Sequence, residues 1–133
     1  MILKAGTILI KDHQIGLIYR SYYDDYSFPK GHLEEGESLL ECAIRETNEE
    51  TKREVIILDE KPIYIENYVD SIGHNCTCYY YVAKDNGISN NESFEVHDLR
   101  WTDFDKVSEL LTYDSTKHLW DSIKNKVKSY IEE

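Results

Sequence analysis

Three carboxylates within one short segment, Glu46, Glu49 and Glu50, have a spacing suited to metal chemistry. On a helix of 3.6 residues per turn, positions i, i+3 and i+4 share one face, so these side chains form one negative patch. Like charges at this spacing destabilise a helix by about 0.2–0.5 kcal/mol, and a hard divalent cation would offset their repulsion. Because Mg²⁺ prefers carboxylate oxygens and shares its shell with substrate phosphates, the pattern predicts a metal site for phosphate chemistry.

Residues of defined type also stand at set distances before these carboxylates, namely Gly31, Glu37 and Arg45. Together they follow the spacing G-x5-E-x7-R-E-U-x-E-E-x-G-U, in which U is a bulky apolar residue. This spacing resembles the Nudix box, which here covers residues 31–53. The chain is identified as a member of the Nudix hydrolase family by these residues.

Three positions depart from the Nudix pattern. Thr47 and Arg53 stand where the pattern has apolar residues, and Lys52 stands where it has glycine. That glycine normally ends the helix in a left-handed conformation. The helix therefore either ends at Lys52 in this conformation or runs on through it.

The resemblance implies Mg²⁺ or Mn²⁺ as the cofactor. Its ligands would be the backbone carbonyl of Gly31 and the carboxylates of Glu46, Glu49 and Glu50. We expect Arg45 to orient a carboxylate through a bidentate pair, which is the geometry that a guanidinium favours. Glu37 is expected to hold the loop before the helix rather than to touch substrate.

Residues on both sides of the box are candidates for binding the substrate. Lys30, in the string Phe-Pro-Lys-Gly-His, is placed to contact a phosphate, and His32 belongs to the same family-like string. Tyr68 and Tyr81 could stack on a nucleobase. Aromatic residues in strands are more often part of the core, so we expect only a minority of the tyrosines to touch a ligand.

The catalytic base has two candidates, Glu46 in the box and Glu95 in a polar segment before Trp101. Many Nudix enzymes carry a glutamate on a loop near this second position, where it binds another metal ion or acts as the base. For Glu95, an ordinary loop carboxylate is an equal alternative, and Glu92 is a neighbouring competitor for the same role.

Length and composition indicate one globular domain over residues 1–133. The formal net charge of −11 disfavours duplex nucleic acid as a partner, because proteins neutralise its phosphates with Lys and Arg. No apolar run is long enough to span a membrane. Three cysteines without a framework spacing favour buried packing in a reducing compartment, and therefore the cytoplasm.

Patterns of apolar residues predict the elements that position these groups. Strands are expected at 2–10, 14–20, 55–58, 63–68, 77–83 and 99–102. Helices are expected at 38–52, 103–111 and 115–131, with a capping box at Ser38 and Glu41 and an N-cap at Asp103. Residues 22–26 and 89–95 are expected to be loops, and 85–87 a turn. Strands interleaved with helices predict an α/β class fold, an α/β/α sandwich with a mixed β-sheet, which the Nudix resemblance also implies.

The resemblance implies Mg²⁺-dependent hydrolysis of a nucleoside diphosphate linked to another moiety, with a small-molecule nucleotide as the substrate. Residues 28–37 are most similar to the asymmetric diadenosine tetraphosphate hydrolases, which release ATP and AMP. A pyrophosphatase acting on modified nucleoside triphosphates, or on RNA 5′ ends, is an alternative. A non-catalytic nucleotide-sensing module is another, but such a module has no need of the complete set of three carboxylates.

Overall fold

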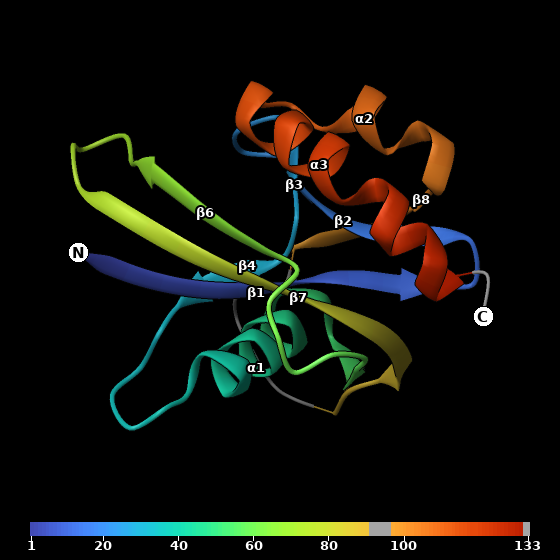
Figure 1. Ribbon diagram of the computed structural model, residues 1–133, viewed down its shortest axis with the longest axis horizontal. Coiled ribbons are helices and arrows are strands. Elements are labelled where there is room, and N and C mark those ends of the chain that lie inside the picture. Colours follow the sequence, from blue (N-terminus) through green and yellow to red (C-terminus); the bar gives the residue numbers. More distant parts are fainter. Residues whose placement is uncertain (91–96, 132–133) are drawn as a thin grey trace.

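The computed structural model describes residues 1–90 and 97–131, whose strands form one eight-stranded mixed sheet. Helix α1 covers one face of this sheet, and helices α2 and α3 cover the other (Figure 1). The strands are β1 (Ile2–Lys11), β2 (Gln14–Arg20), β3 (Asp25–Ser27), β4 (Lys30–His32), β5 (Arg53–Ile57), β6 (Tyr64–Val69), β7 (Asn75–Ile88) and β8 (Asp98–Asp103). The helices are α1 (Leu39–Thr51), α2 (Val107–Leu110) and α3 (Asp114–Ile131), with a 3₁₀ helix at Phe104–Lys106. The predicted α/β/α sandwich with a mixed sheet is confirmed.

Strand β1 is central to the sheet, pairing in parallel with β7 and antiparallel with β2 and β4. In the register with β4, Gly6 lies opposite Lys30 and Ala5 opposite Gly31. A Cβ atom on Gly6 would lie 2.1 Å from the carbonyl oxygen of Pro29, so only glycine permits this close approach. The pairing places the start of the box in the middle of the sheet.

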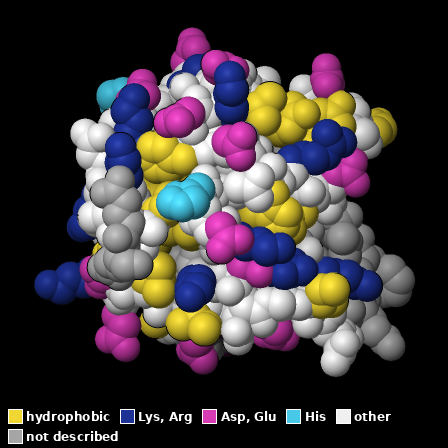
Figure 2. Space-filling model, turned by 90° about the vertical axis from the view of Figure 1, so that its right-hand side faces the viewer, with side chains coloured by type: hydrophobic (Ala, Val, Ile, Leu, Met, Phe, Trp, Pro, Cys, Tyr) yellow, Lys and Arg dark blue, Asp and Glu magenta, His cyan; other side chains and the backbone are white. Residues whose placement is uncertain are grey.

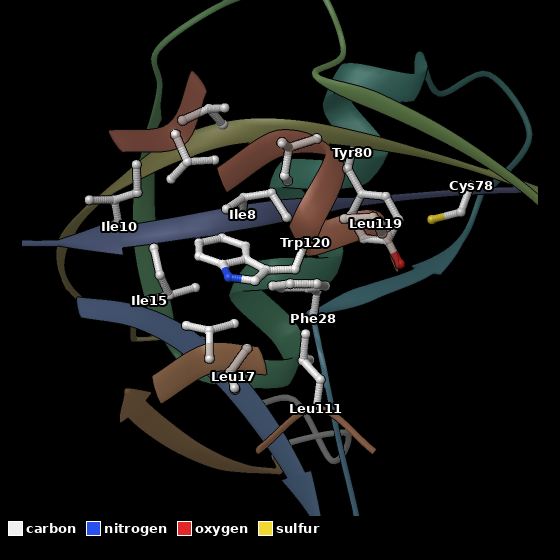
Figure 3. Packing of buried hydrophobic residues seen from close by; sticks show 14 residues of the cluster. Ile8, Ile10, Ile15, Leu17, Phe28, Cys78, Tyr80, Leu111, Leu119 and Trp120 are labelled. Carbon is white, nitrogen blue, oxygen red and sulfur yellow. The ribbon is translucent and has the colours of Figure 1, made fainter. Parts of the chain in front are cut away.

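Two hydrophobic clusters hold the layers together, one on each face of the sheet. In the larger cluster, Trp120 of α3 packs near Phe28, with 6.3 Å between their ring centroids (Figure 3). In the smaller cluster, Ala43 of α1 packs with Ala5 and Tyr81 of the sheet. Since burial of apolar side chains is the main favourable term in folding, these clusters determine where α1 and α3 dock.

The structure corrects the predicted turn at 85–87. Strand β7 continues through these residues to Ile88, because β5 pairs with it antiparallel and supplies hydrogen-bond partners. Arg53 of β5 reinforces the pairing by donating from Nε and Nη2 to Asp85, at 2.7 and 2.6 Å. Long-range pairing therefore outweighs the local turn preference of Asp-Asn-Gly.

Two other predictions on local structure hold only in part. The predicted loop at 22–26 contains the start of β3, which pairs with β2. The helix predicted at 103–111 is present as a 3₁₀ turn followed by α2, but Asp103 makes no capping hydrogen bond, and its carboxylate accepts from Gln14 Nε2 at 3.2 Å. Most other element ends lie within one or two residues of the prediction, and the capping box at Ser38 and Glu41 is confirmed.

In the view of Figure 2, acidic and basic side chains are interspersed among several small hydrophobic patches. No helix in the described ranges is both long and apolar enough to cross a membrane. Cys42, Cys76 and Cys78 are unpaired and buried, as predicted for packing residues.

Candidate active site

Helix α1 presents the three carboxylates, and its position is fixed at its start and in its middle. At the start, Ser38 Oγ accepts from the Glu41 N–H at 3.1 Å, while the Glu41 carboxylate accepts from the Ser38 N–H at 3.0 Å. In the middle, the hydroxyl groups of Thr47 and Thr7 form a buried hydrogen bond of 2.8 Å that joins α1 to β1. These contacts set the rotation of the helix and thus the direction in which its carboxylates point.

Glu46 lies directly against the backbone of β4. Glu46 is only 7% exposed, and a Cβ atom on Gly31 would lie 2.0 Å from its carboxylate carbon. No residue larger than glycine can occupy position 31 while Glu46 keeps this position. The first glycine of the box is therefore explained by the space that Glu46 requires.

Arg45 connects the carboxylates of α1 to the loop before it. Its Nε and Nη2 atoms donate to the two oxygens of Glu37 at 2.6 and 3.0 Å, which is a bidentate pair. Nη2 also donates to the carbonyl oxygen of His32, and Nη1 donates to Glu46 at 2.8 Å and Glu49 at 3.1 Å. The guanidinium lowers the pKa of Glu37 to about 2. Glu37 also accepts from the Glu34 N–H, so it does hold the loop.

A cavity of about 480 Å³ opens beside this network. The charged and imidazole groups that line it are Lys4, Arg20, Lys30, His32, Glu46, Glu50 and His97. Glu50 accepts a hydrogen bond from the backbone N–H of Lys30 at 3.2 Å, which joins the end of the carboxylate patch to β4. Carboxylates suited to a divalent cation and cations suited to phosphate thus line the same cavity.

Arg20 is held in this cavity by a buried partner. Asp25 is 1% exposed and receives hydrogen bonds from Arg20 Nε and Nη2 at 2.8 and 2.5 Å and from the Tyr113 hydroxyl at 2.5 Å. The Arg20 guanidinium holds the pKa of Asp25 below its usual range. Tyr113 precedes α3, so the network also fixes the start of that helix beside the cavity.

The sequence matches the model of the NUDIX domain over residues 2–122, which is most of the chain. The chain belongs to the Nudix hydrolase family. Its Nudix box, residues 31–53, contributes Gly31 and His32 of β4 and Glu46 and Glu50 of α1 to the cavity.

Individual relatives agree with this assignment. An 8-oxo-(d)GTP phosphatase of Mycolicibacterium smegmatis is 31% identical over 100 residues, which are 75% of this chain and 30% of that protein. This chain therefore spans less than a third of that relative's length. The Ap4A hydrolase of C. elegans, in a binary complex, has a TM-score of 0.79 at 21% identity, covering 97% of this chain and 99% of that one. A Nudix hydrolase from Nitrosomonas europaea has a TM-score of 0.78 at 16% identity, covering 94% and 89%. At these identities the two structures show a shared fold alone.

The Nudix box offers oxygen donors of the kind that Mg²⁺ or Mn²⁺ takes. Glu46, Glu50 and Gly31 all line the cavity, and the Gly31 backbone lies against the Glu46 carboxylate. Glu49 does not line this cavity, and like Glu46 it accepts a hydrogen bond from Arg45. Within residues 1–90 and 97–131, no three His, Cys, Asp or Glu side chains are grouped closely enough to hold an ion as they stand. These oxygen atoms are suited to a hard cation. Arg45 neutralises part of the charge of the carboxylates.

The predicted substrate residues differ in where they lie. Lys30 and His32 line the cavity, and Tyr68 lines a second cavity beside it. Tyr81 does not face either of these cavities. It is 5% exposed and packs beneath α1, because side chains alternate along β7 and its neighbour Tyr80 faces α3. Its predicted role in stacking is thus not supported.

Glu95 and Glu92 lie outside the described residues, so their predicted roles stay predictions. Two further cations that line the cavity were not predicted from the sequence, namely Lys4 of β1 and Arg20 of β2. A lysine within the apolar run Ile-Leu-Lys-Ala was the available signal for Lys4. Only the pairing of β1 with β4 brings it beside the box.

Two of the departures from the Nudix pattern are now explained. Lys52 adopts the left-handed conformation of the expected glycine, with φ 57° and ψ 32°, and its N–H donates to the carbonyl of Asn48. Arg53, in place of an apolar residue, forms the pair with Asp85 described above. The helix therefore ends where the pattern requires, despite the missing glycine.

Proposed function

We propose that this Nudix protein is a Mg²⁺-dependent hydrolase of a nucleoside diphosphate linked to another moiety. One observation carries the proposal: Glu46 and Glu50 share a single cavity with Lys4, Arg20 and Lys30. Phosphate-transfer chemistry consists mostly of positioning and charge stabilisation, for which this combination of groups is suited.

Each group has a distinct role in this proposal. The Gly31 carbonyl and the carboxylates of Glu46, Glu49 and Glu50 would hold Mg²⁺ or Mn²⁺, which when bound neutralises charge on the phosphate oxygens. Lys4 and Lys30 contact phosphate as point charges, and Arg20 is preorganised by Asp25 to do so through its planar group. Glu46, or Glu95 outside the described residues, takes the proton from the attacking water.

We place diadenosine tetraphosphate, cleaved to ATP and AMP, first among the substrates, on the resemblance of residues 28–37 to the asymmetric hydrolases. A modified nucleoside triphosphate is the second candidate, because the relative of 31% identity is an 8-oxo-(d)GTP phosphatase. A small-molecule nucleotide as partner and a cytoplasmic location stay predictions.

The test is a hydrolysis screen of dinucleoside polyphosphates and of ordinary and modified nucleoside triphosphates, with and without Mg²⁺. We expect Mg²⁺-dependent turnover whose products identify the bond that is cut. Glu46→Gln should lower kcat by about a hundredfold or more, the scale of one general base. The exposed Glu54→Gln is the matched control and should retain wild-type kcat. Full activity of the Glu46→Gln variant at saturating Mg²⁺ would refute the role of Glu46.

A further inference from the structure

A second cavity, of about 670 Å³, adjoins the first. The two share the lining residues Lys4, Arg20, Ser27 and Lys30. The box carboxylates therefore lie on one side of these cations, and the second cavity lies on the other. Strand β6 and the start of α3 supply much of its remaining wall.

Glu66 of β6 lines the second cavity and has no role in the function proposed above. The residue is only 8% exposed, and within the described ranges its carboxylate makes no hydrogen bond. Burial raises the pKa of Glu66, whereas the nearby Lys4 and Lys30 favour its charged form. A buried carboxylate that lacks hydrogen bonds destabilises a fold, so its presence requires an explanation.

Two tyrosine side chains, Tyr68 and Tyr80, lie near Glu66 on the same face of the sheet. Within the described residues, the buried hydroxyls of Tyr68 and Tyr80 have no hydrogen-bond partner. Tyr68 lines the second cavity, and the Tyr80 hydroxyl lies on the Cys78 side of the core (Figure 3). Cys78 is paired in register with Glu66, so the three oxygen-bearing side chains form one buried polar cluster. Native proteins rarely leave such groups unpaired unless a ligand or water completes them.

We propose that Glu66 recognises the exocyclic amino group of a purine base seated in the second cavity, and that Tyr68 contacts the ring nitrogen beside it. The inference rests on the proposed function, because the shared cations would hold the phosphates that follow the base. A carboxylate accepts hydrogen bonds, and the amino group of adenine or guanine donates them. The Tyr68 hydroxyl can donate to a neighbouring ring nitrogen or accept from a ring N–H. Diadenosine tetraphosphate and 8-oxo-(d)GTP both carry such a purine.

Binding without catalysis tests this proposal directly. ADP, GDP and their analogues lacking the amino group, purine riboside diphosphate and IDP, are titrated into the protein in EDTA. We expect one amino-bearing nucleotide to bind at least about tenfold more tightly than its analogue, since the analogue leaves buried polar groups unpaired. A preference for ADP supports the diadenosine class, and a preference for GDP supports the guanine class. Equal affinities within both pairs would overturn the proposal.

Glu66→Leu removes the acceptor at similar size and should reduce that discrimination to about twofold or less, while Glu54→Leu on the exposed side of β5 should preserve it. Tyr68→Phe should leave Tm unchanged or raise it, because it removes a buried hydroxyl without a partner. Discrimination retained by Glu66→Leu would overturn the proposal, and a lower Tm for Tyr68→Phe would assign its hydroxyl a structural role instead. Discrimination in a protein without hydrolase activity would refute the proposed function and leave the recognition by Glu66 intact.

Discussion

At the residue scale, Arg45 determines how the crowded carboxylates of the box tolerate one another. It donates to Glu37, Glu46 and Glu49, so one cation offsets much of the repulsion that their spacing creates. Glu50 instead accepts from the backbone of β4. Arg45 is thus a positioning residue, which links the carboxylates of α1 to the loop at Glu37.

The pair of Glu37 with Arg45 leads to a prediction on pH. Glu37→Gln should lower the free energy of unfolding by about 1–3 kcal/mol at pH 7, the range for hydrogen bonds to charged groups. The pKa of Glu37 falls from 4.5 to about 2 in the folded protein. A lowered pKa adds stability that is complete above pH 4.5 and is lost as pH falls towards 2.

The stability difference between wild type and Glu37→Gln should therefore narrow between pH 5 and pH 2, as measured by urea unfolding. The exposed Glu35→Gln provides a control for the change in net charge. A difference that stays constant over this range would contradict the assigned pair.

At the element scale, α1 is joined to β1 by a polar contact within an otherwise apolar interface. Thr7 and Thr47 are both fully buried, and their hydroxyls satisfy each other. Thr47 stands where the Nudix pattern has an apolar residue, so Thr7 compensates for that departure. The position of α1, and with it the carboxylate patch, depends on both residues.

A double-mutant cycle tests this compensation. Thr7→Val and Thr47→Val should each destabilise the fold by about 1–3 kcal/mol, because each leaves one buried hydroxyl unpaired. The double variant removes both groups at nearly constant volume and should be close to wild type in unfolding free energy. Additive losses in the double variant would show that the hydroxyls do not act as a pair.

The C-terminus of α1 gives a second prediction at this scale. Lys52 has a positive φ of 57°, which strains any residue with a Cβ atom. Lys52→Gly should therefore raise the unfolding free energy, by at most about 1 kcal/mol. The same substitution at the exposed Lys126, inside right-handed α3, should lower it by about 1 kcal/mol. A lower Tm for Lys52→Gly would reject the left-handed cap.

At the scale of the whole molecule, the local charge at the cavities is opposite in sign to the net charge of the chain. The chain has a formal net charge of −11, yet Lys4, Arg20 and Lys30 meet between the two cavities. Local cations can thus bind phosphate in a protein whose overall field repels it. A divalent cation on the acidic side would further reduce this repulsion.

Binding of a divalent metal ion should therefore stabilise the folded protein even when no substrate is present. Mg²⁺ at a hundred times its Kd should raise the unfolding free energy by about 2.7 kcal/mol, and EDTA should reverse the accompanying rise in Tm. Glu50→Gln should require a higher Mg²⁺ concentration for the same rise, whereas Glu54→Gln should match wild type. An identical Mg²⁺ response in the Glu50→Gln variant would exclude Glu50 as a ligand.

Local patterns were sufficient for α1, α3 and most strands, because helical and strand periodicity depend on neighbours in the sequence. They failed where distant segments compete with local preference. The turn residues at 85–87 became part of β7 once β5 paired with them. Tyr81 could not be distinguished from a ligand-binding tyrosine, because both faces of a fully covered strand carry large side chains.

Spacing within one short segment was sufficient to predict the family, the carboxylate face of α1 and the residue types available for phosphate chemistry. The packing of α1 on the sheet was needed to show that Glu46 and Glu50 line the cavity and that Arg45 contacts both Glu46 and Glu49. The tertiary structure also brought Lys4 and Glu66 to the same region from separate strands. The physical reason is that sheet register and helix docking are set by hydrogen bonds and burial between segments far apart in the chain.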